Sequence, residues 1–237
     1  MNGRYVLLLA VLAALAGCTA PAPAAVAAAP PPAQTATLAP AAAKQQLTNG
    51  AATCDYDVTW LTVSGLTADA TATANAALDM TPQPADCEDS VSVSGGYRDT
   101  TLNERGVLSA TYMVFKFAAG AAYPNLILQT YVIDLATGQE IPLDDVLTPQ
   151  GRTTFVDACR KGLDPGLAGF GDYCGYAYDT AGPDAPYTVS RDGLVAQPRN
   201  EVPHVSQALA DKGVLVPWAA LGEGLRPGTP IAALAGR

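Results

Sequence analysis

The sequence predicts an α+β fold in which an antiparallel β-meander is combined with two main helices, arranged in two small lobes and stabilised by disulfides. Three observations support this prediction. Stretches of alternating apolar and polar residues are typical of strands, two stretches of helical period each begin at a threonine, and four cysteines follow residue 50. A hydrophobic content of 49% is enough for a buried core.

The amino-terminal residues indicate export. Arg4 precedes an apolar stretch, 5–14, that is too short to span a bilayer, and residues 15–18 read Leu-Ala-Gly-Cys. This order resembles the lipobox of bacterial lipoproteins, in which the cysteine receives a diacylglycerol and becomes the new amino terminus. We therefore expect a lipoprotein signal peptide over 1–17 and a lipid on Cys18. The alternative is an ordinary secretory signal with an incidental cysteine.

The residue after the lipidated cysteine indicates to which membrane the lipoprotein is sorted. Thr19 is not the aspartate that typically retains lipoproteins at the inner membrane. We expect a protein of the cell envelope, held by its lipid alone and placed at the outer membrane facing the periplasm, because no later segment has the length of a membrane span.

Composition then divides the mature chain. Residues 18–43 hold the lipidated cysteine and an uncharged stretch rich in Ala, Pro and Thr, which predicts an extended linker. The folded domain is expected over 44–237, with lobes at approximately 44–95 and 96–237.

The chain is acidic. Its formal charge is −9, and without Arg4 the mature chain has 12 basic and 22 acidic residues, or −10. This charge argues against nucleic acid and anionic lipid as partners and favours a cationic protein. The alternative is that acidity serves solubility alone.

The first lobe is expected to contain a strand, a helix and a second strand. Residues 54–63 alternate as a strand does, and Thr67 is a suitable cap for a helix over 68–80. The next strand contains Val91 and Val93 and is expected to stop at Gly95 and Gly96.

The second lobe begins with the meander. Its three strands are expected at 106–117, 126–135 and around Ile141 and Leu143. Thr148 and Pro149 then start a helix that ends near Gly162. Two short strands follow, at 187–189 and 213–217.

Four cysteines remain once Cys18 carries lipid, and they allow three pairings. Neighbourhood in the sequence favours Cys54 with Cys87 and Cys159 with Cys174 in an oxidising compartment. Zinc is the rival interpretation, but the spacing does not match pairs of ligands and the chain has a single histidine.

Several stretches resemble one known domain. Residues 131–146 (Tyr-Val-Ile-Asp-Leu-Ala-Thr-Gly-Gln-Glu-Ile-Pro-Leu-Asp-Asp-Val), the closing segment 213–221 and the segment 58–78 with Asn75 are similar to the extracytoplasmic domain shared by RsiV anti-sigma factors and the peptidoglycan deacetylase PdaC. The resemblance implies an α+β fold and a binding activity, since the RsiV version binds lysozyme and the PdaC version accompanies an enzyme acting on peptidoglycan. The chain departs from the family at 118–122, where members typically carry Gly-Gly-Ala-His, and it lacks the deacetylase domain.

The sequence contains no convincing catalytic constellation. His204 is alone, and no nucleophile elbow, phosphate-binding loop or dinucleotide fingerprint is present. We expect no enzyme activity, no cofactor and no metal. The alternative is a hydrolase acting on cell-wall glycan through paired carboxylates, either Asp86, Glu88 and Asp89 or Asp144 and Asp145.

Two groups of residues are candidates for binding. The acidic cluster Asp86, Glu88 and Asp89 suits a cationic protein. Four tyrosines, at 173, 176, 178 and 187, crowd a loop that a disulfide would partly fix, and they serve either as recognition anchors or as packing on the sheet. The residues of these groups are Asp86, Glu88, Asp89, Tyr173, Tyr176, Tyr178 and Tyr187.

Taken together, the sequence predicts an envelope lipoprotein with a non-enzymatic domain that binds a lysozyme-like muramidase or peptidoglycan. A glycan hydrolase of the envelope and a structural envelope protein are the alternatives.

Overall fold

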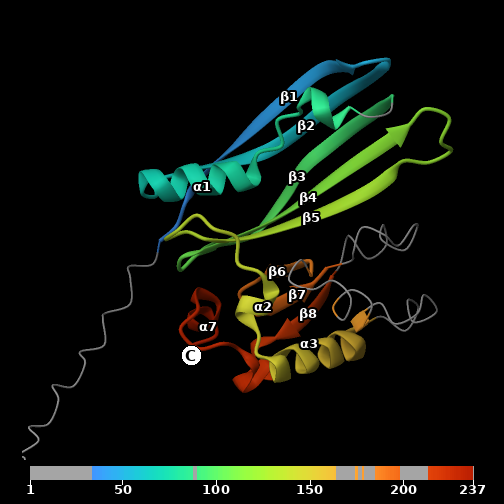
Figure 1. The fold of residues 1–237 in the computed structure, drawn as a ribbon. Helices are drawn as coiled ribbons and strands as arrows, with labels where there is room; N and C mark the ends of the chain where they lie inside the picture. Colours follow the sequence, from blue (N-terminus) through green and yellow to red (C-terminus); the bar gives the residue numbers. More distant parts are fainter. Residues whose placement is uncertain are drawn as a thin grey trace, which may run out of the picture. The chain divides into compact units, whose positions relative to one another are not determined.

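The computed structural model describes residues 34–87, 90–163, 174–175, 178, 185–197 and 213–236. All of them belong to one compact unit, Pro32–Arg237. The unit contains a five-stranded sheet of order β1-β2-β3-β4-β5 and a three-stranded sheet of order β6-β7-β8, together with helices, so the predicted α+β class is confirmed (Figure 1). No described helix combines the length and the apolar character that crossing a bilayer requires.

The strands of the larger sheet are β1 Thr37–Asn49, β2 Ala52–Ser64, β3 Val91–Glu104, β4 Val107–Ala118 and β5 Asn125–Asp134, and those of the smaller sheet are β6 Tyr187–Val189, β7 Gly193–Ala196 and β8 Val214–Pro217. The α-helices are α1 Ala68–Leu78, α2 Leu143–Val146, α3 Pro149–Gly162, α6 Trp218–Leu221 and α7 Pro230–Leu234, and the 3-10 helices are η1 Pro84–Asp86 and η4 Gly222–Gly224.

The larger sheet is mixed. Strands β1 and β2 form an antiparallel hairpin, and β3, β4 and β5 form an antiparallel meander. The two parts join through a short parallel pairing of β2 with β3, in which 55–59 lie beside 92–96. Parallel neighbours need a crossover connection, which α1 and η1 provide here.

Strand β1 corrects the expected start of the folded domain at residue 44. The strand begins at Thr37 and pairs with β2 along its whole length, from Thr37 opposite Ser64 to Asn49 opposite Ala52. An edge strand is held by backbone hydrogen bonds to its neighbour, so a sequence rich in Ala suffices, and Pro40 is tolerated at an edge. The expected lobe boundary at 95/96 falls inside β3, so the two sheets do not follow it.

The structure also differs from the expected end of β3 at Gly95 and Gly96. Gly95 and Gly96 have φ angles of +106° and +122°, and the strand continues through both of them. A Cβ atom on Gly96 would lie 2.0 Å from the Thr59 carbonyl oxygen of β2. The glycines therefore allow two strands to approach closely and do not end the strand.

Two further expectations about strands differ from the structure. Among the described residues, those around Ile141 make one bridge, between Ile133 and Glu140, and Leu143 is buried at the start of α2. The third strand of the meander is β3 instead. Strand β7 is an additional short strand that the sequence analysis does not predict.

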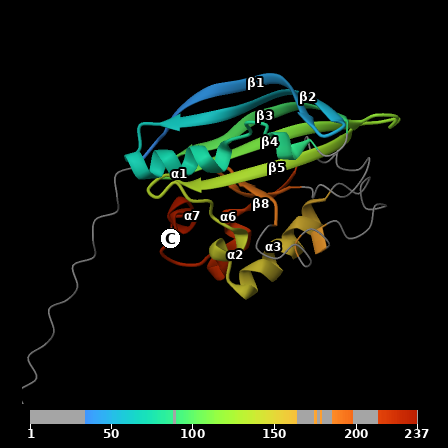
Figure 2. The same ribbon diagram turned by 45° about the horizontal axis from the view of Figure 1, so that its top comes forward.

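Both main helices start where the capping residues predict. The Thr67 hydroxyl accepts from Ala70 N–H, and the Thr148 hydroxyl accepts from Gly151 N–H. Helix α1 ends at Leu78, two residues before the expected end, and it lies along the larger sheet (Figure 2). The Asn75 amide joins α1 to β2, since it accepts from Val63 N–H at 2.7 Å and donates to Val63 C=O at 3.0 Å.

The smaller sheet packs on one end of the larger sheet. The Val189 carbonyl accepts from the Thr101 hydroxyl at 2.8 Å, and Val189 N–H donates to the Ser109 hydroxyl at 2.9 Å. Behind this contact, Phe155 and Cys159 of α3 share a buried core with Leu194 and Val216. The end of the larger sheet that contains Ser92 and Ser94 stays exposed.

Candidate binding surface

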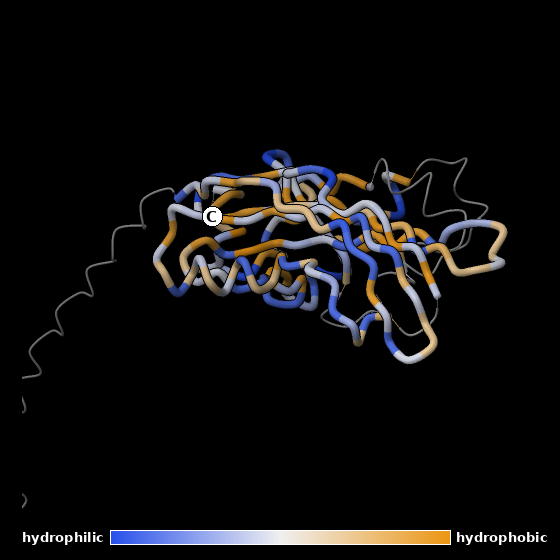
Figure 3. Tube along the Cα trace, turned by 90° about the horizontal axis from the view of Figure 1, so that it is seen from above, coloured by the Kyte–Doolittle hydropathy of each residue, from blue (hydrophilic) through white to orange (hydrophobic). Residues whose placement is uncertain are grey.

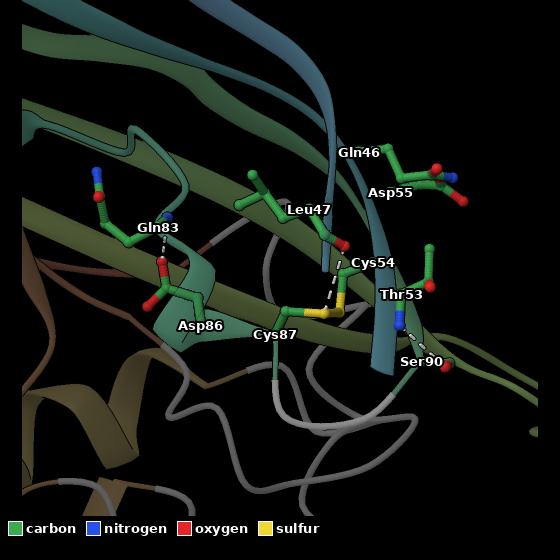
Figure 4. Close-up of a disulfide and its surroundings, with 9 residues drawn as sticks. All are labelled: Gln46, Leu47, Thr53, Cys54, Asp55, Gln83, Asp86, Cys87 and Ser90. Atoms are coloured by element: carbon green, nitrogen blue, oxygen red, sulfur yellow. Dashed lines mark hydrogen bonds between the residues drawn. A yellow bond between two sulfur atoms is a disulfide. The ribbon is translucent and has the colours of Figure 1, made fainter. Parts of the chain in front are cut away.

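The predicted disulfides are confirmed. Cys54 and Cys87 are bonded with their Cα atoms 5.7 Å apart (Figure 4), and Cys159 and Cys174 are bonded with their Cα atoms 5.9 Å apart. All four side chains are buried. The first disulfide ties the segment after η1 to β2, and the second ties α3 to the segment that follows it.

One member of the predicted acidic cluster can be placed. Asp86 is exposed at the end of η1, and its carboxylate accepts from Gln83 N–H at 2.7 Å (Figure 4). Burial, and then the Asp86 charge, raise the pKa of Tyr56. Glu88 and Asp89 lie outside the described residues, as do Cys18, Tyr173, Tyr176 and His204.

Tyr178 and Tyr187 are buried, so the anchor interpretation is wrong for both of them. The Tyr178 ring meets Phe155 edge-on at 4.9 Å, and its hydroxyl donates to the Pro186 carbonyl at 2.8 Å. The Tyr187 hydroxyl donates to the Ile141 carbonyl, and burial raises its pKa well above the ordinary value. Both side chains therefore serve packing.

The second carboxylate pair has a structural contact. The Asp144 carboxylate forms an ion pair with Arg152, and the Asp144 carbonyl accepts from Arg226 at 2.8 Å. Asp145 is exposed on α2. This ion pair connects α2 to α3, which is a role in stability.

A regular set of polar side chains covers the open end of the larger sheet. We call it the polar grid: Lys44 and Gln46 on β1, Asp55 and Asp57 on β2, and Ser92 and Ser94 on β3. Strand register places Gln46, Asp55 and Ser92 in one row and Lys44, Asp57 and Ser94 in the next. Rows in a sheet are about 6.6 Å apart and neighbouring strands about 4.8 Å apart. All six residues are exposed.

Hydrogen bonds order the β1–β2 part of the grid. Lys44 Nζ lies 2.8 Å from Asp57 Oδ2, and Gln46 Nε2 donates to Asp55 Oδ1 at 2.8 Å. The hydrogen bond to Asp57 and its charge raise the pKa of Lys44, which stays protonated. Figure 3 shows the hydrophilic stretches of the two strands in blue, side by side as their register requires.

The grid lies over two hollows. One has a volume of about 590 Å³ and is lined by Asp57, Thr59, Ser94, Gly96 and Met113 among others. The other has a volume of about 550 Å³ and is lined by Lys44, Gln46, Asp55 and Ser92 among others. Because Asp57 and Ser94 line both of them, the two hollows adjoin.

An apolar column borders the grid on β4. Phe117, Phe115 and Met113 lie directly opposite Ser92, Ser94 and Gly96, and directly opposed residues in a sheet point to the same face. Phe117 is 42% exposed, and Phe115 and Met113 are partly exposed. A row of hydroxyl groups therefore runs beside a row of apolar side chains.

The charges that line the hollows balance. Lys44 and Arg98 are basic, and Asp55 and Asp57 are acidic, so their formal charges sum to zero. The whole chain has a formal charge of −9. This surface is thus polar but neutral within an acidic protein.

The sequence held a signal for part of this surface. Asp55 and Asp57 alternate with Cys54, Tyr56 and Val58, so the alternation that predicts the strand also places both acids on its exposed face. Their partners could not be found in this way, because Lys44 and Gln46 lie at the expected linker boundary.

Comparison with known proteins shows the fold. No family model and no curated protein matches the chain. A DUF3298-family protein of Bacteroides fragilis has a similar structure, with a TM-score of 0.58 and 13% identity over 85% of this chain and 98% of that one. A DUF3298-family protein of Pseudomonas aeruginosa has a TM-score of 0.49 and 12% identity over 82% and 96%. The first likeness shows that the two proteins share a fold.

Proposed function

We propose that this chain is an envelope lipoprotein, anchored through Cys18 at the outer membrane and facing the periplasm, whose folded domain binds peptidoglycan or a lysozyme-like muramidase without turning it over. The lipobox-like sequence supports export, and the two disulfides suit an oxidising compartment. The fold likeness is consistent with a domain of the RsiV/PdaC type.

The observation that carries this proposal is the polar grid beside the apolar column. Its side chains stand on a sheet, and hydrogen bonds between strands order several of them, which favours binding because little freedom is lost when a ligand arrives. In the grid, the hydrogen bond to Asp57 and its charge raise the pKa of Lys44, so this ammonium group stays protonated at neutral pH. Such groups suit hydrogen bonding better than proton transfer.

The binding proposal is tested with cell-wall sacculi and lysozyme. Purified protein is expected to sediment with sacculi, or to form a salt-sensitive complex with lysozyme that slows lysis. Release of sugars from sacculi without added enzyme would support the hydrolase instead. Absence of both binding and release would leave the structural role.

The anchor is tested separately. Cells given labelled palmitate are expected to incorporate label into the protein, and Cys18→Ser should abolish the incorporation. Export without label would support the ordinary secretory signal.

A further inference from the structure

We propose that the polar grid and the apolar column together form a binding site for a neutral glycan strand of amino sugars. This inference rests on the proposed function and deepens it, since it names the surface and the ligand chemistry. A sugar ring has an apolar C–H face and an edge of hydroxyl and acetamido groups. A site for such a ring needs an aromatic surface with hydrogen-bonding groups at its side.

The grid supplies the hydrogen-bonding side of this site. Asp55 and Asp57 each use one carboxylate oxygen toward β1, and their second oxygens, Asp55 Oδ2 and Asp57 Oδ1, accept no hydrogen bond from the described residues. In Figure 4 Asp55 and Gln46 stand together on the side of β2 away from the Cys54–Cys87 disulfide. Hydroxyl groups of Ser92 and Ser94 both donate and accept, as sugar hydroxyls do.

The apolar column supplies the stacking side. Phe117 and Phe115 lie one strand away from Ser92 and Ser94, at a spacing of about 4.8 Å, so a ring above a phenylalanine has its polar edge over a serine. Along the strand, the distance from Ser92 to Gly96 is about 13 Å, which gives the site room for a short oligosaccharide.

Charge selects a neutral ligand. The formal charges of the four charged residues that line the hollows cancel. This surface therefore attracts a cationic protein no more strongly than the acidic remainder of the chain does. A strongly anionic polymer would be repelled by the net charge of −9. A glycan made of N-acetylated amino sugars carries no charge on its backbone.

The test uses the full chain and a tetramer of β-linked N-acetylglucosamine, followed by calorimetry. Asp55→Ala and Phe117→Ala are expected to weaken binding by about tenfold each, because each removes a contact worth roughly 1.4 kcal/mol. Both residues are exposed, so the fold should survive, which circular dichroism checks. Asp69→Ala on α1 and Leu215→Ala on β8 are matched controls that remove an exposed acid and an exposed apolar side chain outside the site, and they should bind as the unmodified chain does.

The outcomes separate the site from the function. If the tetramer binds and neither grid variant changes its affinity, the assigned surface is wrong while glycan binding stands. If the tetramer does not bind and lysozyme does, the glycan inference fails and the proposed function holds through its muramidase partner. If neither ligand binds and the protein does not sediment with sacculi, both proposals fail.

Discussion

Replacement of Gly96 by alanine should break the junction on which the polar grid depends. Gly96 faces Thr59 in the parallel pairing of β2 with β3, at the end where β2 turns away toward α1. An added Cβ atom would lie 2.0 Å from the Thr59 carbonyl oxygen and 2.8 Å from its nitrogen. Since both are backbone atoms, no side-chain rotation relieves the clash.

Two costs add at this position. Alanine at a φ of +122° is strained by about 1–3 kcal/mol. Overpacking against a fixed neighbour costs a further 1–3 kcal/mol, roughly. The expected loss of about 4 kcal/mol is a large share of a stability that is typically about 5–15 kcal/mol.

Gly120→Ala is the matched control. Gly120 has a φ of +82° with nothing within 4 Å of an added Cβ atom, so it isolates the strain, roughly 1–2 kcal/mol. Urea unfolding of both variants is followed by circular dichroism and by tryptophan fluorescence, to which Trp60 on β2 contributes. If the two variants lose equal stability, the close approach of β2 and β3 is not what requires glycine. A Gly96→Ala protein that still folds should bind the tetramer more weakly, because the rows of the grid shift.

Three further predictions concern stability. Asn75→Ala should lower the free energy of unfolding by about 2 kcal/mol, because it leaves both Val63 backbone groups without a partner. The control Thr73→Ala, on the exposed face of α1, should change it little. Equal urea midpoints for the two variants would contradict this prediction. Replacing Cys159 and Cys174 together by serine should lower the unfolding free energy by about 3 kcal/mol for a loop of 15 residues, and unchanged thermal unfolding would argue that the disulfide is dispensable. Burial raises the pKa of Tyr112 above its ordinary value of 10. The contribution of Tyr112 to stability is therefore complete below about pH 10 and is lost as the pH rises further. A Tyr112 phenol that ionises near pH 10 in the folded protein, seen by tyrosinate absorbance, would contradict this prediction.

Local signals in the sequence were enough for the elements that carry their own pattern. Thr67 and Thr148 mark the starts of α1 and α3, alternation marks β2 and β4, and β-branched and apolar residues mark β5. Nearness in sequence also identified both disulfides. Each of these features is decided by residues close to one another in the chain.

The remaining features depend on pairing between segments that are distant in the sequence. Strand β1 has no apolar alternation of its own and exists because β2 offers backbone groups along 13 residues. The two glycines of β3 look like a turn until Thr59 is known to lie against them. Tyr178 and Tyr187 could equally be anchors or core residues from sequence, because only the position of α3 and of the second sheet shows that they are covered. The grid was hidden for the same reason, since its rows cross three strands.

The strands of the two sheets differ in length, and this difference explains why part of the larger sheet is available as a binding surface. Strands β3 and β4 have 14 and 12 residues, or about 40 Å, whereas β6, β7 and β8 have three or four, or about 13 Å. The smaller sheet contacts the larger one near Ser109 and Thr101, and at the far end of the same face Ser92, Ser94 and Phe117 are exposed. Solvation alone would be satisfied by polar residues at every exposed position there. Strand β4 instead presents Phe115 and Phe117 beside the serines of β3, and this mixture is what a ligand with one apolar face and one polar edge requires.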